Sequence, residues 1–156
     1  MTDLPVQPTT TEIPKDLSEI PDDPSAVVVK PGAYLLELIP IPVSDIERAK
    51  QFYTEQCGFH LDVDVTPAEG VRIIQLTPPG SFCSISLTTG LDQLAMPPGS
   101  QRGLHLVVKD IEAARQELIG RGVEVSPTED LGGVFYAWFQ DPDGNTWALQ
   151  HMPWRR

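Results

Sequence analysis

The sequence has little cysteine: only Cys57 and Cys83 occur among its 156 residues. This pair matches neither the close spacing of a zinc site nor the framework of a disulfide-rich secreted domain. Isolated thiols of this kind are typical of proteins from reducing compartments. The sequence therefore predicts a cytoplasmic protein without structural disulfides.

Positive charge is also scarce. The chain carries 11 Lys and Arg against 22 Asp and Glu, which gives a formal net charge of −11. An excess of negative charge repels nucleic-acid phosphates and anionic membranes, so neither is an expected partner. A neutral or cationic small molecule is compatible with this charge. So is the simpler explanation that the acidic residues keep the protein in solution.

Long apolar runs are absent as well. No stretch approaches the ~20 apolar residues that a membrane-spanning helix needs. The first residues do not combine a basic head with an apolar run, as a secretory signal does. We therefore expect neither a membrane span nor a signal peptide.

Proline is abundant at the start of the chain, with six prolines between Met1 and Pro31. Proline fixes φ and lacks a backbone donor, so this segment suits neither a helix interior nor a central strand. We interpret residues 1–32 as an extended N-terminal arm. Its run Ala26–Val29 is either an added edge strand or part of a flexible tail.

A duplication organises the rest of the chain. The stretch Val43–Ala49 returns as Val108–Ala114, so Asp45 corresponds to Asp110, 65 residues later. A second match, at nearly the same spacing, relates the turn ending at Gly80 to the one ending at Gly144. Such self-similarity indicates a structural unit that occurs twice. We expect modules over residues 33–90 and 102–153, joined by a linker over 91–101 and followed by a tail over 154–156.

Each module is expected to have the order β-α-β-β-β. In the first module, Ser44 and Glu47 have the spacing of a capping box and Gly58 ends the helix; the expected strands are 34–43, 59–65, 71–77 and 82–88. In the second module, the helix covers 110–119 and the strands cover 103–108, 123–126, 134–140 and 146–152. Asp141–Asn145 has the composition of a tight turn.

Two units of this size and order resemble the vicinal oxygen chelate superfamily, which includes glyoxalases, bleomycin resistance proteins and extradiol dioxygenases. The residues that carry the resemblance are Pro42–Asp45, Gly58-Phe59, Gly103–Asp110, and Asp141–Asn145 followed by Trp147. The resemblance covers about residues 34–152. It implies an α+β fold in which the two modules form a curved mixed sheet around a cleft. It also implies small-molecule binding and a homodimer, in some members with modules paired between chains.

Enzymatic members of the superfamily place four metal ligands on the cleft-facing strands. By the resemblance, these positions fall at Leu38, Gly103, Ser84 or Ser86, and Ala148 or Gln150. Because leucine and glycine side chains cannot bind a metal and none of the others is a carboxylate, no cofactor is predicted. The alternative is a divalent Zn, Ni, Mn or Fe ion held by Glu37, His105 and Gln150, which requires a bulge near Pro40 or Pro42 to turn Glu37 toward the cleft.

Strand alternation indicates which side chains face the cleft. His105 is either a cleft imidazole that binds ligand or moves a proton, or a half-buried histidine bonded to neighbouring backbone. Gln150 either orients a ligand or fills space beside His105. Trp138 can stack on a flat or cationic ligand, although aromatic residues at strand spacing usually belong to the core. The full set of expected ligand-binding residues is Leu38, Phe82, Ser84, Ser86, His105, Trp138 and Gln150.

Three functions remain open from the sequence. The first is a small-molecule binder with an apolar, aromatic cleft and no catalytic metal. The second is a metal-free lyase or isomerase that uses His105 as its acid or base. The third is a glyoxalase- or dioxygenase-like metalloenzyme with a degenerate site. The sequence favours the binder and does not identify the ligand.

Overall fold

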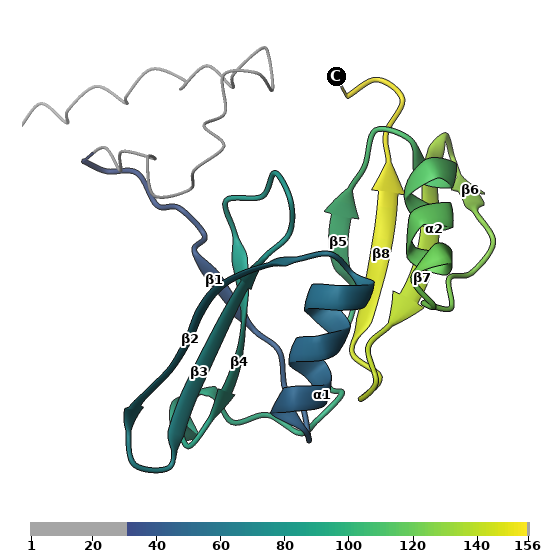
Figure 1. Ribbon diagram of the computed structural model, residues 1–156. Coiled ribbons are helices and arrows are strands. Elements are labelled where there is room, and N and C mark those ends of the chain that lie inside the picture. Colours follow the sequence, from purple (N-terminus) through teal and green to yellow (C-terminus); the bar gives the residue numbers. More distant parts are fainter. Residues whose placement is uncertain (1–30, 156) are drawn as a thin grey trace, which may run out of the picture.

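The computed structural model describes residues 31–155 and contains two modules with the same order of elements (Figure 1). Each module runs strand, helix, then three strands, so the predicted α+β fold with two βαβββ units is confirmed. The N-terminal arm before residue 31, including the run Ala26–Val29 that was open between an edge strand and a flexible tail, lies outside the described residues.

The first module forms one four-stranded sheet. Its strands are β1 (Leu38–Pro40), β2 (His60–Ala68), β3 (Val71–Thr77) and β4 (Ser84–Thr89), in the order β1-β4-β3-β2. The β1–β4 pair is parallel and the other pairs are antiparallel. Helix α1 (Ile46–Gln51) continues directly into a wider π turn, η3 (Phe52–Gln56).

The second module repeats this sheet. Its strands are β5 (Leu104–Val107), β6 (Glu129–Leu131), β7 (Val134–Gln140) and β8 (Thr146–His151), in the order β5-β8-β7-β6. Again, the first and last strands are parallel. Helix α2 (Ile111–Gly120) follows β5, and a short 3₁₀ turn, η4 (Asp92–Leu94), lies between the modules. The matching strand order supports the duplication read from the sequence.

Helix α1 begins differently from the prediction. Its N-cap is Asp45, whose carboxylate accepts a hydrogen bond from the backbone N–H of Arg48 at 3.0 Å. Ser44 instead donates its hydroxyl to Asp143 of the second module at 2.5 Å. The prediction that Ser44 caps the helix in a capping box with Glu47 is therefore wrong by one residue. An aspartate caps a helix as well as a serine does, and α2 is capped in the same way by Asp110.

Two predicted strands also differ. The first is shorter than residues 34–43, because Tyr34, Leu35 and Leu36 are exposed and have no pairing strand. The predicted strand at 123–126 does not form. The buried Val123 donates its N–H to Leu118 at the end of α2, so this segment completes the helix and the strand starts later, at β6.

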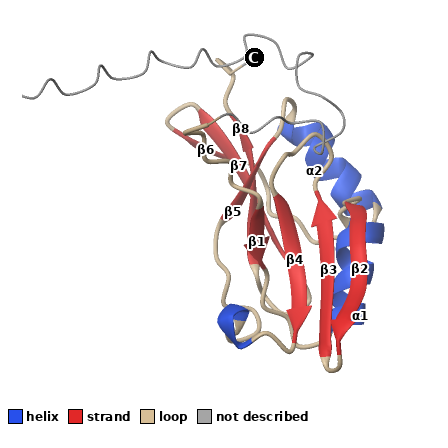
Figure 2. Cartoon of the chain, turned by 90° about the vertical axis from the view of Figure 1, so that its left-hand side faces the viewer, coloured by secondary structure: helices blue, strands red, loops and turns tan. Residues whose placement is uncertain are grey.

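The helices cover one face of each sheet, and these covered faces share a single core. Figure 1 shows α1 between the two sheets, and Figure 2 shows it behind the first sheet. Tyr53 and Phe59 of the first module pack against Trp147 of the second, with ring centroids 5.8 and 5.7 Å apart. Because the helix-covered faces point inward, the opposite face of each sheet points outward.

A buried carboxylate fixes the two modules to each other. Asp141 is 3% exposed and accepts hydrogen bonds from the Tyr53 hydroxyl at 2.8 Å and the Asn145 amide at 2.7 Å. Asn145 also donates to the backbone carbonyl of Pro42 at 2.9 Å. Burial first, and the Asp141 charge second, raise the pKa of Tyr53 far above its ordinary value, so the phenol stays neutral and donates. The predicted turn at residues 141–145 is thus also the joint between the modules.

Candidate functional site

The outward side of the first sheet carries mainly hydroxyl groups and aliphatic side chains. Successive residues in a strand point to opposite faces. The strand register pairs Leu38 with Ser84 and Gln75 with Ser86, while Ile74 and Leu76 on the other face are fully buried against the helices. We call this outward surface the hydroxyl face; its members are Leu38, Val63, Val65, Ile73, Gln75, Ser84, Ser86 and Thr88.

Two hydroxyls on this face have no hydrogen-bond partner among the described residues. Ser84 is satisfied, since it contacts the Gln75 amide at 3.1 Å and the Thr77 hydroxyl at 2.6 Å. The buried oxygens of Ser86 and Thr88 have none. Both residues line a small hollow of about 140 Å³ that is closed by Pro40 and by residues of the linker. A buried polar group without a partner costs about 1–3 kcal/mol, so each of these hydroxyls has an unused capacity for a hydrogen bond.

The outward side of the second sheet carries aromatic rings. The Tyr136 and Trp138 rings lie nearly parallel, with centroids 6.2 Å apart and an interplanar angle of 16°. The His105 ring stands edge-on to both, at 5.9 and 6.1 Å. The Gln150 amide donates to the Tyr136 hydroxyl at 2.9 Å. We call this surface the aromatic face; its members are His105, Val107, Tyr136, Trp138, Ala148 and Gln150.

The hydrogen bond that His105 makes fixes which of its nitrogens is free. Nδ1 lies 2.6 Å from the backbone carbonyl of Gly103. Because a carbonyl only accepts, Nδ1 carries the proton, and in the neutral ring Nε2 is left as an acceptor. The side chain therefore makes the backbone bond expected of a structural histidine and still presents a basic nitrogen.

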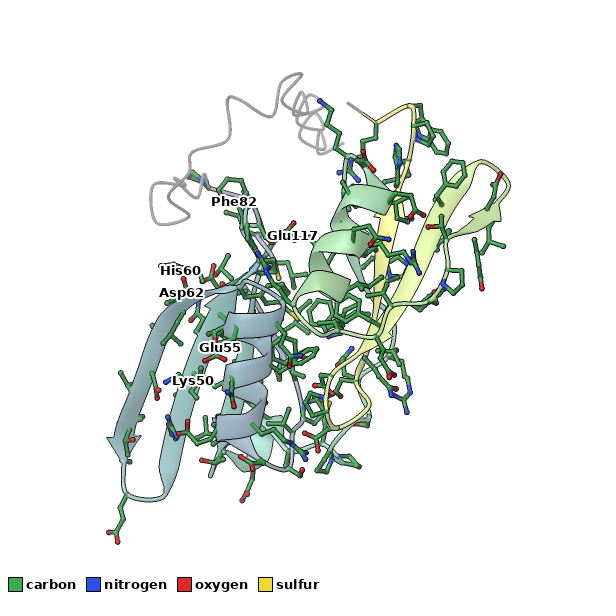
Figure 3. The ribbon with its side chains drawn as sticks, turned by 45° about the vertical axis from the view of Figure 1, so that its right-hand side comes forward. Lys50, Glu55, His60, Asp62, Phe82 and Glu117 are labelled. Atoms are coloured by element: carbon green, nitrogen blue, oxygen red, sulfur yellow. The ribbon has the colours of Figure 1, made fainter. Side chains whose placement is uncertain are left out.

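The structure distributes the expected ligand-binding residues over these two faces. Leu38, Ser84 and Ser86 lie on the hydroxyl face, and His105, Trp138 and Gln150 lie on the aromatic face. Phe82 differs from the expectation, because it lies in the loop before β4 and not in the strand itself (Figure 3). Three further residues were missed: Gln75, Thr88 and Tyr136. Tyr136 was detectable from the sequence, since it lies two residues before Trp138 and so shares its face.

One chain does not close these two faces into a single cleft. The core is built from the opposite faces of both sheets, so the hydroxyl and aromatic faces lie outside it; on the hydroxyl face Val63 and Val65 are exposed, while Ser84 and Ser86 are buried. Trp138 is 36% exposed and Val107 is 49% exposed. Large apolar side chains exposed in this way are typical of binding surfaces. Each chain therefore presents two separate faces with different chemistry.

The residues on these faces do not fit a catalytic divalent metal. Strand β1 pairs with β4 without a bulge, so Leu38 and not Glu37 lies on the hydroxyl face. Within residues 31–155, no group of three His, Cys, Asp or Glu side chains is placed to hold an ion. The remaining donors on the two faces are uncharged hydroxyls and amides with a single imidazole. A catalytic metal site in proteins normally has three protein ligands rich in histidine or carboxylate.

Comparison with known proteins establishes the family. Residues 34–149 match the sequence profile of the Glyoxalase/Bleomycin resistance protein/Dioxygenase superfamily. The chain belongs to this superfamily. The match spans both modules and omits the N-terminal arm, as the resemblance read from the sequence implied.

Several solved structures are similar. TnmS3, an antibiotic binding protein from Streptomyces sp. CB03234, is 37% identical, with 78% of this chain and 98% of TnmS3 covered and a TM-score of 0.68. A glyoxalase/bleomycin resistance protein from the same organism is 41% identical, with coverages of 72% and 96% and a TM-score of 0.62. A relative by sequence, the YwkD protein of Bacillus subtilis (strain 168), is described as uncharacterized. It is 33% identical, with 67% of this chain and 87% of YwkD covered.

Two further observations bear on location. Cys57 and Cys83 are both free thiols. Among the helices of residues 31–155, none is long and apolar enough to cross a bilayer.

Proposed function

We propose that this protein binds a small, flat organic molecule between the hydroxyl face of one copy and the aromatic face of a second copy. The observation that carries the proposal is the presence of two chemically unlike sheet faces on one chain, both outside the core that the modules share. A homodimer that joins them makes two equivalent, closed sites. The proposal includes no catalytic metal, and the two free thiols support a cytoplasmic location.

The two faces offer complementary chemistry to such a guest. Parallel Tyr136 and Trp138 rings form a surface on which a flat ring system can stack. The unpartnered hydroxyls of Ser86 and Thr88 can bond oxygen or nitrogen atoms at its edge. The net charge of −11 suits a neutral or cationic guest better than an anionic one. TnmS3 is described as an antibiotic binding protein, which supports a drug-sized guest.

Oligomeric state and binding test the proposal together. Analytical ultracentrifugation should show a dimer, and titration with proflavine, a flat fluorescent cation, should be saturable. Trp138→Ala should weaken proflavine about tenfold through lost stacking. Trp154→Ala is the matched control, because Trp154 is an exposed tryptophan in the C-terminal tail, beyond the end of β8. A monomer that binds with full affinity would contradict the dimeric site.

A mixing experiment tests whether the site is shared between copies. Ser86→Leu blocks the hydroxyl face and Trp138→Ala truncates the aromatic face, so each variant alone should bind poorly. In a mixed dimer, one site carries both changes and the other carries neither. Mixing the two variants should therefore restore binding at one site per mixed dimer. No recovery, with subunit exchange demonstrated, would show that the faces act within one chain.

A second candidate function is metal-free acid–base catalysis by His105. A general base needs a free acceptor nitrogen on a ring that is held in place. Nε2 of His105 meets this need, because the hydrogen bond from Nδ1 to the Gly103 carbonyl holds the ring. His105→Ala separates the two functions. A binder loses affinity modestly, whereas an enzyme loses turnover far more than affinity. Stoichiometric Zn, Ni, Mn or Fe in the purified protein would overturn both metal-free candidates.

A further inference from the structure

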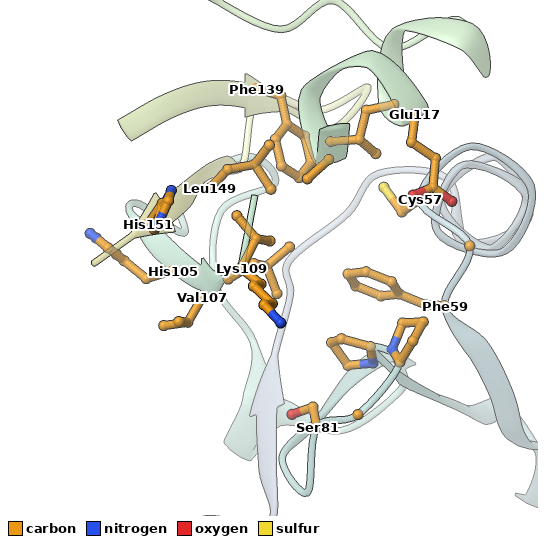
Figure 4. Close-up of a pocket in the computed structure, with 18 of the residues that line it drawn as sticks. Cys57, Phe59, Ser81, His105, Val107, Lys109, Glu117, Phe139, Leu149 and His151 are labelled. Carbon is orange, nitrogen blue, oxygen red and sulfur yellow. The ribbon is translucent and has the colours of Figure 1, made fainter. Parts of the chain in front are cut away.

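We infer that the cavity between the two modules is a second binding site, for a small amphipathic anion. The cavity has a volume of about 1160 Å³ and lies between α2 and β5 on one side and the β3–β4 loop on the other (Figure 4). Known small-molecule pockets measure about 300–1,000 Å³, so there is room for a drug-sized molecule. This cavity is distinct from the site proposed above, although His105 and Val107 at the edge strand β5 belong to both.

The floor of the cavity is apolar. Its lining includes Phe59 from the first module and Leu106, Phe139 and Leu149 from the second. Leu106 and Leu149 are paired across β5 and β8 and lie on the helix side of the sheet. They therefore point away from the aromatic face, whose members His105 and Gln150 alternate with them. The cavity therefore lies mainly on the helix side of the sheet and meets the aromatic face only at the edge strand β5, where His105 and Val107 also line it.

Positive charge surrounds the opening. Lys109 and Arg155 both line the cavity, and neither side chain has an ion-pair partner among residues 31–155. Figure 4 shows Lys109 extending from the end of β5 toward the space between Phe59 and Ser81. Two unpaired cations at one cavity stand out in a chain whose net charge is −11.

The acidic groups nearby do not cancel this charge. Glu117, the carboxylate that lines the cavity, is paired with Arg121 at 2.7 Å. The Cys57 thiol also lines the cavity, but burial first and the Asp141 charge second raise its pKa, so it contributes no negative charge. The unpaired charge at the opening is therefore positive.

An apolar floor with an unpaired cation at the rim defines the class of ligand. The ligand is a molecule with an aliphatic or aromatic body and one carboxylate or sulfonate group. Burial of the body is favoured by about 25 cal/mol per Å² of apolar surface, and the anion pairs with the Lys109 ammonium. This charge preference is opposite to that of the proposed cleft, which suits neutral or cationic guests.

Calorimetric titration with decanoate and decanol, at submicellar concentrations, tests the inference. The two probes share an apolar chain and differ in charge. Lys109→Gln should weaken decanoate about tenfold, as expected for one lost charge-assisted hydrogen bond, and should leave decanol unchanged. Gln116→Glu is the control, because it shifts the net charge by the same amount at an exposed position of α2 outside the cavity.

Methyl NMR locates the bound probe. Decanoate should perturb Val108 and Leu149, which line the cavity, and spare Val63 and Val65 on the hydroxyl face. Perturbation confined to the hydroxyl face, equal decanoate affinity in the Lys109→Gln variant, or no saturable binding would each overturn the inference. The proflavine titration tests the proposed function separately. A failure of the cavity to bind decanoate can therefore be told apart from a failure of the proposed site between two copies.

Discussion

Thr77 and Asp141 occupy equivalent positions, 64 residues apart, where each module turns from its third strand toward its fourth. Thr77 bonds only within its own module, to the Ser84 hydroxyl at 2.6 Å and to Asp62. Asp141 instead accepts a hydrogen bond from the hydroxyl of Tyr53, which belongs to the other module. The comparison shows that one copy of a duplicated turn has become the joint between the copies. In the first module, the residues after Thr77 instead line the cavity between the modules, through Pro78, Pro79 and Ser81.

The outward faces of the two sheets diverge in the same way. Ser84 and Ser86 in β4 correspond to Ala148 and Gln150 in β8, and the partner strands carry Gln75 in one module and Tyr136 in the other. Identical backbone architecture thus presents hydroxyls on one sheet and aromatic rings on the other. Under the proposed function, two copies of the chain bring these unlike surfaces together around one guest, which needs both stacking and hydrogen bonds.

Removing the joint should have the largest effect. Asp141→Ala leaves the Tyr53 hydroxyl, the Asn145 amide and two backbone N–H groups without their acceptor. We expect a loss of about 3–5 kcal/mol in the free energy of unfolding, measured by urea denaturation. Thr77→Ala, the equivalent change in the first module, should cost about 1 kcal/mol. Equal losses would contradict the asymmetry between the two turns.

Substitution of a linker glycine should have the second-largest effect on the free energy of unfolding. Gly99 has φ +76, and an added Cβ would lie 2.0 Å from the backbone oxygen of Asp143, in the joint turn. Gly99→Ala should therefore cost about 2–3 kcal/mol, the sum of positive-φ strain and a backbone clash. Gly103 has a similar φ of +68 but nothing within 4 Å. Gly103→Ala should cost only the strain, about 1–2 kcal/mol, in the same urea experiment.

The phenol at the joint should have an intermediate effect. Tyr53→Phe keeps the ring packed against Trp147 and removes the hydroxyl that donates to Asp141 and accepts from the Trp147 indole at 3.1 Å. The expected cost is about 1–2 kcal/mol. In the Asp141→Ala background the same substitution should cost much less, because the donor has already lost its acceptor. If Tyr53→Phe cost the same free energy in both backgrounds, the double-mutant cycle would contradict a hydrogen-bond network shared by Tyr53 and Asp141.

The smallest effect concerns a surface ion pair. Hydrogen bonds from Arg72, and then from Lys50, hold the pKa of Asp64 well below its usual range. A lowered folded pKa stabilises the protein above the unfolded pKa of about 3.9, and this stabilisation disappears as pH falls through the lower folded value. The difference in urea midpoint between wild type and Asp64→Asn should thus be present at pH 7 and shrink below about pH 4.

An unpaired carboxylate in the equivalent strand of the second module is the control for this pH dependence. Glu129 is an exposed carboxylate in β6, the strand equivalent to β2, and it has no ion pair among residues 31–155. Glu129→Gln should leave the urea midpoint nearly unchanged at both pH values. A pH-dependent shift as large as that of Asp64→Asn would show that the ion pair is not its cause.

Much of the fold was accessible from the sequence because the pattern occurs twice. The repeat of Val43–Ala49 at Val108–Ala114 located both helix starts to within one residue, and alternation placed Leu38, Ser84 and His105 on the same faces as their predicted neighbours. Details that depend on competing local bonds were not accessible. Ser44 and Asp45 are both good N-caps, and only the position of Asp143 in the folded protein draws Ser44 away from the helix.

The candidate site was only partly accessible. Strand parity grouped His105 with Gln150 on one sheet and Ser84 with Ser86 on the other, and Tyr136 follows from the same rule. Phe82 was misplaced because the strand after the Pro-Pro-Gly turn starts two residues later than its apolar character suggested. The charged cavity was invisible in the sequence, since its lining residues come from distant segments of both modules.

The sequence by itself determined the duplicated modules, the acidic character and the uncharged outward faces, because these follow from periodicity and composition. Only the tertiary structure decided how the modules meet: through the covered faces of their sheets, with Asp141 sealing the contact. The physical reason is that strand alternation sets which side chains share a face, but says nothing about which face a neighbouring module will bury. That choice depends on the fit of Tyr53, Phe59 and Trp147 in one core.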